Sequence, residues 1–316
     1  MKRTLCYLMI FITIILLLGC KLDPKLKEAD IIEDSILGTV YKQAPHDVAV
    51  VEIPHGVTRI ADGAFGNAVW LKEVTIPDTV TGIGKEAFFG CSSLTSITIP
   101  GSVIGIGAGA FSDCSGLTSI TISNSITYIS SCVFEGCTGL TSITIPDSVT
   151  TIGNSAFYGC AGLTSVTIPN SVTKIEKSSF QGCSGLTSVM IPRYVTEIGS
   201  DAFKDCTCAV VFASGRTTIP SRALSGADGI SSVTIPNTVT GIGSEAFKGC
   251  TGLTSITIPN SVTTIGGEAF KGCTKLVYIT FGGTVEQWET VYTGSYWKSE
   301  VPATVIHCSD GDVELN

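Results

Sequence analysis

The stretch IPDSVTTIGNSAFYGCAGLTSVT, residues 145–167, decides the fold of this chain of 316 residues. Its pattern recurs every 23 residues with different filler, and each copy begins at an apolar residue that we call position 0. The ten copies begin at Ile53, Ile76, Ile99, Ile122, Ile145, Ile168, Ile191, Phe212, Ile235 and Ile258. The interval from Ile191 to Phe212 is two residues short. Self-similarity at a fixed period of this length is the signature of a solenoid, in which each repeat packs only against its neighbours.

Apolar residues recur within each copy at positions +4, +7, +12, +18 and +21. In the fifth copy these are Val149, Ile152, Phe157, Leu163 and Val166. The segment LTSVTI that closes this copy alternates apolar and polar residues and is rich in β-branched types, which predicts a strand with one buried face. A proline follows the strand in eight copies and ends its pairing, because proline lacks the N–H donor. We therefore predict one strand per turn, in a single parallel sheet along one face.

The consensus of these copies is L-x-x-I-x-I-P-x-x-V-x-x-I-x-x-x-A-F-x-G-C, and residues 140–160 nearly match it. It resembles the leucine-rich repeats of the BspA-like bacterial surface family, and the resemblance extends from Ile53 to Phe281. The resemblance implies an α/β repeat fold: a right-handed leucine-rich-repeat solenoid of about ten 23-residue repeats, capped at both ends, with the strands on one face. It also implies export and a role in adhesion, coaggregation or binding of host matrix proteins.

The first 20 residues have the features of a targeting segment. Lys2 and Arg3 precede the apolar stretch from Leu5 to Leu18, which at about 14 residues is shorter than the ~20 that a membrane span needs. The segment ends in Leu-Leu-Gly-Cys, which resembles a bacterial lipobox, so we expect cleavage before Cys20 and lipidation of Cys20. The alternative is an uncleaved signal anchor. Lipidation predicts an exported protein anchored to the outer membrane or the cell surface.

The remaining chain divides into three parts. Residues 21–45 are predicted to be a polar tether and lead-in, residues 46–281 the solenoid, and residues 282–316 a C-terminal cap. An N-terminal cap strand is expected within Gly38–Val51, because the first repeat would otherwise leave an open sheet edge. The acidic run from Glu28 to Asp34 is interpreted as a solvated spacer.

In the C-terminal cap, apolar residues at helical spacing predict a helix within Val285–Tyr292, and Ala303–His307 reads as a strand. Capping of the last repeat is the favoured role. The alternative is a carbohydrate-binding platform formed by Trp288, Tyr292, Tyr296 and Trp297. Asp310 and Asp312 are interpreted as part of a solvated end.

Cysteine recurs at position +15. The eight members of this column are Cys91, Cys114, Cys137, Cys160, Cys183, Cys206, Cys250 and Cys273. Their uniform spacing differs from that of a C-x-x-C metal site, and stacked parallel side chains are badly aimed for disulfides. We interpret them as buried thiols that fill the core, with a disulfide ladder or a metal column as the alternatives. Local pairing remains open for Cys206, Cys208 and Cys308.

Positions +20 and +22 of each strand face outward and are mostly serine and threonine, including Thr144, Thr167 and Thr234. Such a ladder is a candidate surface for a glycan, a protein or ordered water, as in repeat-built ice-binding proteins. The alternative is that threonine simply suits an exposed strand position.

The seventh and eighth copies depart most from the repeat, and beside them Met190 and Val211 interrupt this serine and threonine field. Beside them, Arg193 and Tyr194 replace the usual residues after the strand, and Arg216 replaces the usual valine at +4. Apolar surface rimmed by arginine and tyrosine is typical of an interaction hot spot, so these five residues are candidate ligand contacts. The alternative is a decayed repeat that bulges without function.

Composition narrows the function further. A net charge of −8 and a pI near 4.9 argue against nucleic acid, which needs a basic stripe. The sequence contains no arranged acid–base pair or activated nucleophile, so we predict no enzyme, no cofactor and no metal site. The leading hypothesis is a surface-tethered adhesion protein that binds an extracellular protein, from host matrix or another cell surface, or a glycan. The alternative is a structural or periplasm-facing scaffold lipoprotein without a host ligand.

Overall fold

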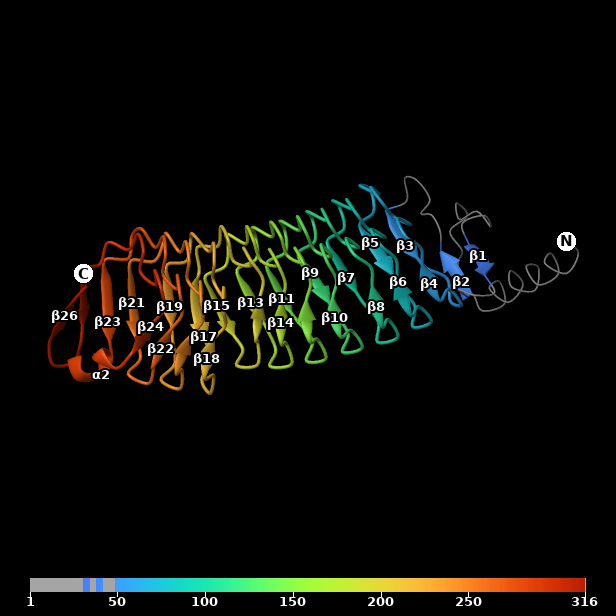
Figure 1. Cartoon of the computed structure of the whole chain (residues 1–316). Coiled ribbons are helices and arrows are strands. Elements are labelled where there is room, and N and C mark those ends of the chain that lie inside the picture. Colours follow the sequence, from blue (N-terminus) through green and yellow to red (C-terminus); the bar gives the residue numbers. More distant parts are fainter. Residues whose placement is uncertain (1–30, 35–37, 42–48, 316) are drawn as a thin grey trace, which may run out of the picture.

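The computed structural model describes residues 31–34, 38–41 and 49–315. They form an elongated array with the N-terminal strands at one end and the C-terminal hairpin at the other (Figure 1). The predicted targeting segment, the predicted lipidation site Cys20 and most of the predicted tether lie outside the described residues. Within the described part of the chain, no helix has the length and apolar character needed to span a bilayer.

Each turn of the array contributes two strands. The strands at positions +20 to +22 form the first sheet: β3 (Val50–Glu52), β5 (Glu73–Thr75), β7 (Ser96–Thr98), β9 (Ser119–Thr121), β11 (Ser142–Thr144), β13 (Ser165–Thr167), β15 (Ser188–Ile191), β17 (Ala209–Phe212), β19 (Ser232–Thr234), β21 (Ser255–Ile258) and β23 (Tyr278–Phe281). Hydrogen bonds divide this sheet into the groups β3–β5, β7–β9, β11–β13, β15–β17–β19 and one that begins with β21–β23. Paired strands of these groups run in parallel one turn apart, as Ile143 of β11 does with Val166 of β13. This confirms the predicted solenoid with parallel strands.

A second sheet, divided into three hydrogen-bonded groups, follows the array and is an addition to the single predicted sheet. Its strands lie at positions +6 and +7: β4 (Arg59–Ile60), β6 (Gly82–Ile83), β8 (Gly105–Ile106), β10 (Tyr128–Ile129), β12 (Thr151–Ile152), β14 (Lys174–Ile175), β16 (Glu197–Ile198), β18 (Thr218–Ile219), β20 (Gly241–Ile242) and β22 (Thr264–Ile265). Each strand has only two residues, and its isoleucine points inward. A two-residue strand is too short to show alternation, so its sequence reads only as one more apolar position.

The core consists of columns of identical side chains stacked along the array. Phenylalanines at +12 stack face to face from Phe65 to Phe203, with ring centroids 4.7–5.8 Å apart. Leu224 interrupts the column in the eighth turn, and Phe247 and Phe270 resume it at 5.0 Å. The ring separation is close to the ~4.8 Å between neighbouring strands, so each ring covers the face of the next. No single repeat can bury these faces alone, and stability depends on the neighbouring turns.

Glycine at position +8 permits a close approach between turns. A Cβ on Gly199 would lie 2.4 Å from the backbone nitrogen of Lys177 in the preceding turn. Equivalent clashes of 2.4–2.6 Å occur at Gly84, Gly107, Gly153, Gly243 and Gly266. The other four turns have Ala61, Ser130, Glu176 and Pro220 at this position, and Glu176 is the only charged residue among them.

The N-terminal end is closed by a hairpin. Strand β1 (Ile31–Asp34) pairs antiparallel with β2 (Gly38–Tyr41), and β2 pairs in parallel with β4. Strand β2 begins within the range predicted for the cap strand. Strand β1 lies in the stretch predicted to be a solvated spacer, so that stretch adds a strand to the second sheet.

At the C-terminal end, the tail builds an eleventh turn before it closes the array. Helix α2 (Val285–Glu289) falls within the predicted helical range, and β24 (Tyr292–Thr293) extends the second sheet. Strand β25 (Val305–His307) pairs in parallel with β23, and β26 (Asp312–Glu314) then pairs antiparallel with β25. The inserted helix makes this turn longer than 23 residues, which hid it from the sequence period.

The alternative of a tryptophan platform in this cap is wrong. Trp288 and Trp297 are buried, and their rings lie 6.0 Å apart inside the cap. Trp297 stands edge-on to Phe270 at 6.1 Å and ends the phenylalanine column. Only Tyr292 and Tyr296 of the four predicted aromatic residues face solvent. The tryptophans are needed to cover the last apolar layer, which no further turn covers.

Candidate functional site

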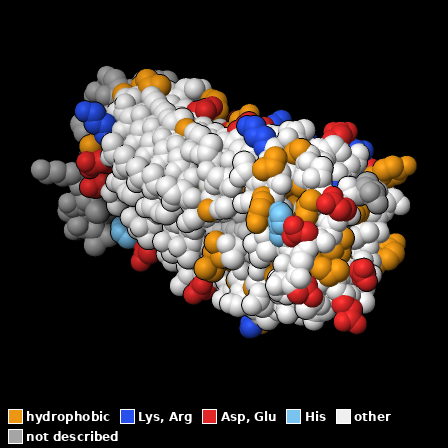
Figure 2. Space-filling view, turned by 90° about the vertical axis from the view of Figure 1, so that its left-hand side faces the viewer, with side chains coloured by type: hydrophobic (Ala, Val, Ile, Leu, Met, Phe, Trp, Pro, Cys, Tyr) orange, Lys and Arg blue, Asp and Glu red, His pale blue; other side chains and the backbone are white. Residues whose placement is uncertain are grey.

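The outward side of the first sheet is a field of exposed hydroxyl groups. The serines and threonines at +20 and +22 are exposed while the residue between them points inward. In Figure 2 a broad area along the array is white, the colour of uncharged polar side chains and backbone, and apolar and acidic side chains gather at the C-terminal end. The predicted outward positions of Thr144, Thr167 and Thr234 are confirmed.

These hydroxyls differ from the other threonine columns in their bonding. Threonines at +5 and +19 donate to the backbone carbonyl one turn back, as Thr150 does to Thr127 and Thr164 does to Thr141. Thr144, Thr167 and Thr234 have no such intramolecular bond among the described residues. Their donors and acceptors are therefore open to a ligand or to water.

The apolar interruption of this field is continuous. Met190 of β15 lies directly opposite Val211 of β17, which lies opposite Thr234 of β19. The Met190 side chain is 59% exposed, well above the buried neighbours on its strand. The shortened turn thus keeps its strand register, and it places two apolar side chains next to each other where other turns have threonine.

Arg193 and Tyr194 form a second exposed element beside this interruption. The Arg193 guanidinium lies over the Tyr194 ring at 4.4 Å from its centroid, and its Nη2 donates to the Tyr194 hydroxyl. The pair is exposed, with 49% of Tyr194 accessible. Stacking of this kind restricts both side chains to one orientation.

Arg216 does not belong to this surface, which corrects its predicted place on the rim of the hot spot. Its Nη2 donates to the carbonyls of Pro192 at 2.6 Å and Val195 at 2.8 Å, and its Nη1 to the carbonyl of Thr218 at 3.1 Å. Only 4% of Arg216 is exposed, and burial lowers its pKa. Backbone carbonyls take the place of the carboxylate partner that a buried guanidinium usually needs.

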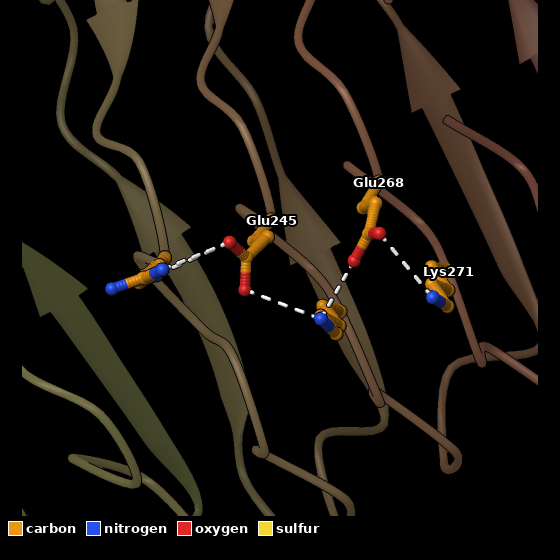
Figure 3. Close-up of polar contacts among 5 residues, drawn as sticks. Glu245, Glu268 and Lys271 are labelled. Carbon is orange, nitrogen blue, oxygen red and sulfur yellow. Dashed lines mark hydrogen bonds and ion pairs between the residues drawn. The ribbon is translucent and has the colours of Figure 1, made fainter. Parts of the chain in front are cut away.

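An exposed chain of ion pairs follows the shortened turn. Arg222 bonds Glu245, Lys248 lies between Glu245 and Glu268, and Lys271 bonds Glu268 at 3.3 Å (Figure 3). The hydrogen bond from Arg222 lowers the pKa of Glu245, and that from Lys248 lowers the pKa of Glu268. All five charges are satisfied within the chain, so this row ties turns eight to ten together and is not a free charged patch.

The cysteine column is buried, as predicted, and it is also hydrogen-bonded. Each thiol donates to the carbonyl of the +12 residue in the preceding turn, as Cys160 does to Phe134 at 3.0 Å. Burial raises the pKa of Cys160 to about 12. Cys208 is also a buried free thiol, and the influence of the neighbouring Cys206 thiol lowers the pKa of Cys208. Protonated, buried thiols are poor nucleophiles, which argues against cysteine chemistry in the column.

The C-terminal end of the first sheet carries a small polar cluster. The rings of Tyr278 and His307 stack at 4.3 Å, and His307 Nδ1 lies 2.9 Å from an oxygen of Asp312. The neighbouring Cys308 is partly buried, and burial together with Asp310 and Asp312 raises its pKa. Asp310 and Asp312 are exposed, as predicted, and Asp310 also accepts from the backbone nitrogen of Val285. Across the described residues, no three histidine, cysteine or acidic side chains are grouped to hold a metal ion.

Comparisons with known proteins agree with this architecture. The model of the family described as "BspA type Leucine rich repeat region (6 copies)" matches residues 40–161, 105–218 and 217–295. A leucine-rich cell-surface protein from Faecalibacterium prausnitzii is 28% identical, with a TM-score of 0.53 over 84% of this chain and 97% of its own. A leucine-rich repeat protein from Bacteroides ovatus is 25% identical, with a TM-score of 0.57 over 88% of this chain and 85% of its own. Among curated proteins, none matches the chain.

Proposed function

The chain belongs to the BspA-type leucine-rich repeat family, and from this premise we propose that it is a surface-tethered adhesion protein which binds an extracellular protein. The partner would be a host matrix protein or a protein on another cell. Members of this family are typically non-enzymatic, and a similar protein of known structure is a cell-surface protein. Solenoids of this kind offer a long, regular face on which a few variable positions give specificity.

The observation that carries the proposal is the paired Met190 and Val211 on an otherwise hydroxyl-bearing face. Interfaces obtain most of their binding energy from a small apolar or aromatic centre, surrounded by polar contacts that exclude water. Met190 and Val211 supply the centre, Arg193 and Tyr194 an oriented aromatic contact, and the hydroxyls around them the polar rim. Arg216 supports this surface from inside and makes no contact with the partner.

The test is saturation binding of the purified protein to immobilised fibronectin and fibrinogen. Met190→Lys and Tyr194→Ala are each expected to weaken binding by roughly tenfold or more, the loss of about 1.4 kcal/mol that a central contact contributes. The matched control is Ile104→Lys, because Ile104 is exposed at 71% but lies beside the second sheet. Equal affinity in all four proteins would overturn the proposed site. Absence of binding to any protein partner would favour the scaffold hypothesis.

We also propose that the protein is exported and anchored through a lipid on Cys20, in the outer membrane or on the cell surface. The Leu-Leu-Gly-Cys sequence that ends the apolar segment supports this proposal. Cys20→Ala is expected to abolish the mass increase of a diacylglyceryl group and to prevent stable membrane attachment. Protease treatment of whole cells then separates surface display from a periplasmic location, since only displayed protein is digested.

A further inference from the structure

We propose that a depression beside the second sheet, in turns five to eight, binds a neutral oligosaccharide. The depression has a volume of about 660 Å³, within the ~300–1,000 Å³ typical of ligand sites. Its walls include Asn154, Lys174, Glu176, Glu197 and Ser221. It is separate from Met190 and Val211, which lie on the first sheet, so this proposal does not depend on the adhesion proposal.

The charged groups of the depression form one bonded set. Lys174 Nζ lies 3.2 Å from a Glu197 oxygen and 3.8 Å from a Glu176 oxygen. The other Glu176 oxygen accepts from the backbone nitrogen of Asn154 at 3.1 Å. The carboxylates of Glu176 and Glu197 can each accept further hydrogen bonds, and the Lys174 ammonium can donate one more. Free donors and acceptors for a ligand therefore lie next to each other. Neighbouring hydroxyls of a sugar ring, each of which can both donate and accept a hydrogen bond, match this arrangement of donors and acceptors.

An aromatic ring borders the set. The Tyr128 hydroxyl lies 3.4 Å from Glu176, two turns along the array, and the side chain is 40% exposed. To reach Glu176 it passes over the fifth turn, where a Cβ on Gly153 would lie 2.8 Å from the Tyr128 oxygen. The missing Cβ of Gly153 thus makes room for the Tyr128 hydroxyl. An exposed aromatic ring beside paired polar groups is an amphipathic surface, suited to the apolar face and hydroxyl edge of a sugar ring.

The sixth turn departs from the repeat at the residue that organises this set. Glu176 occupies position +8, where six turns have a glycine because a Cβ would contact the backbone of the turn before. Close packing between turns favours a residue without a side chain at this position, so a glutamate there is unexpected. It holds the ring of Tyr128, the ammonium of Lys174 and the Asn154 backbone in one arrangement.

The charge balance indicates a neutral ligand. Lys174 and Lys177 are offset by Glu176 and Glu197 within the lining, so the site attracts neither phosphate groups nor a polycation. The hydrogen bond from Lys174 to Glu197 raises the pKa of Lys174, so the ammonium remains charged near neutral pH. Binding through hydroxyl groups alone should depend only weakly on salt.

The experiment is a titration of the full-length protein with cellobiose, maltotriose, mannobiose and N,N′-diacetylchitobiose, followed by saturation-transfer NMR and calorimetry. At least one sugar is expected to bind, and both Tyr128→Ala and Glu197→Gln are expected to weaken its affinity by at least about tenfold. Tyr158→Ala is the matched control, since Tyr158 is also 40% exposed but, unlike Tyr128, does not bond Glu176. Its affinity should equal that of the unmodified protein.

Two results would overturn the proposal. One is the absence of binding by all four sugars. The other is sugar binding that both Tyr128→Ala and Glu197→Gln leave unchanged. Thermal unfolding of each variant separates a lost contact from a lost fold, because both side chains are solvent-accessible and neither belongs to the buried core. The fibronectin and fibrinogen assays should be unaffected by either substitution.

Discussion

Arg216 donates a hydrogen bond of 2.6 Å to the backbone carbonyl of Pro192, which precedes it by 24 residues in the neighbouring turn. The two residues face each other across the boundary where the repeat is two residues short. The Arg216 side chain thus adds hydrogen bonds between the shortened turn and the next to those of the backbone, in a position where other turns have valine or isoleucine.

Arg216→Ala is therefore expected to lower the free energy of unfolding by about 3–5 kcal/mol, because three buried carbonyls lose their partner and a cavity remains. The measurement is the urea midpoint followed by circular dichroism. The control is Arg222→Ala in the same turn, whose side chain is 63% exposed and whose solvent-screened ion pair should contribute little to stability. Equal effects of the two substitutions would contradict the structural role of Arg216.

Gly199→Ala is expected to destabilise the array by about 1–3 kcal/mol, because the new Cβ would meet the backbone of Lys177 at 2.4 Å and push two turns apart. Gly105→Ala is the control, since a Cβ there has no heavy atom within 4 Å. That substitution should be neutral or stabilising by roughly 0.5 kcal/mol. Thermal melts of both variants test the difference, and an equally stable Gly199→Ala protein would count against the close approach.

Phe157→Ala should cost about 3–5 kcal/mol, because Phe157 is fully buried and stacks on Phe134 and Phe180. Phe157→Leu should cost clearly less, about 1–2 kcal/mol, since Leu224 fills the equivalent position in the eighth turn. Denaturant unfolding of the two variants side by side gives the comparison. If leucine and alanine were equally harmful, the column would depend on ring stacking and not on filled volume.

The buried thiols predict a loss of stability at alkaline pH. The pKa of Cys160 is about 12 in the folded chain and 9.0 when unperturbed, so above pH 9 the unfolded chain releases this proton first. Stability from this group is complete below about pH 9 and declines as the pH rises toward 12. Urea midpoints at increasing pH above 9 should fall less steeply for Cys160→Ala than for the unmodified protein. Parallel pH curves would show that the thiol does not contribute.

The repeated side chains were predictable because each occurs many times at the same spacing. The 23-residue period seen in residues 145–167 was enough to identify the inward columns, the outward hydroxyls and the buried cysteines. Strand β12 was not predicted, because Thr151 and Ile152 alone have no periodicity that distinguishes a strand. The eleventh turn was also missed, since helix α2 lengthens it and Trp297 replaces the usual phenylalanine.

The contacts that depart from the repeat pattern could not be predicted from the sequence. Arg216 was expected to need an exposed position, because its partners are backbone carbonyls and leave no mark on the sequence. Tyr128 and Glu176 are 48 residues apart, and only the stacking of turns brings them together. Both cases began with a residue that departs from its column. Such departures are therefore the best sequence signal for function in a periodic chain.

The edge-on contact of Trp297 with Phe270 has a consequence for how such a molecule changes its length. A column of face-to-face rings accepts another ring at either end, whereas a perpendicular tryptophan does not present a face for continued stacking. Strand β26, which runs against the direction of its neighbour, likewise gives no template for another parallel strand at that edge. Extra 23-residue units can thus be added between existing turns but not beyond the last one. The reach of the protein is set by how many interior units it contains, while its closing end stays the same.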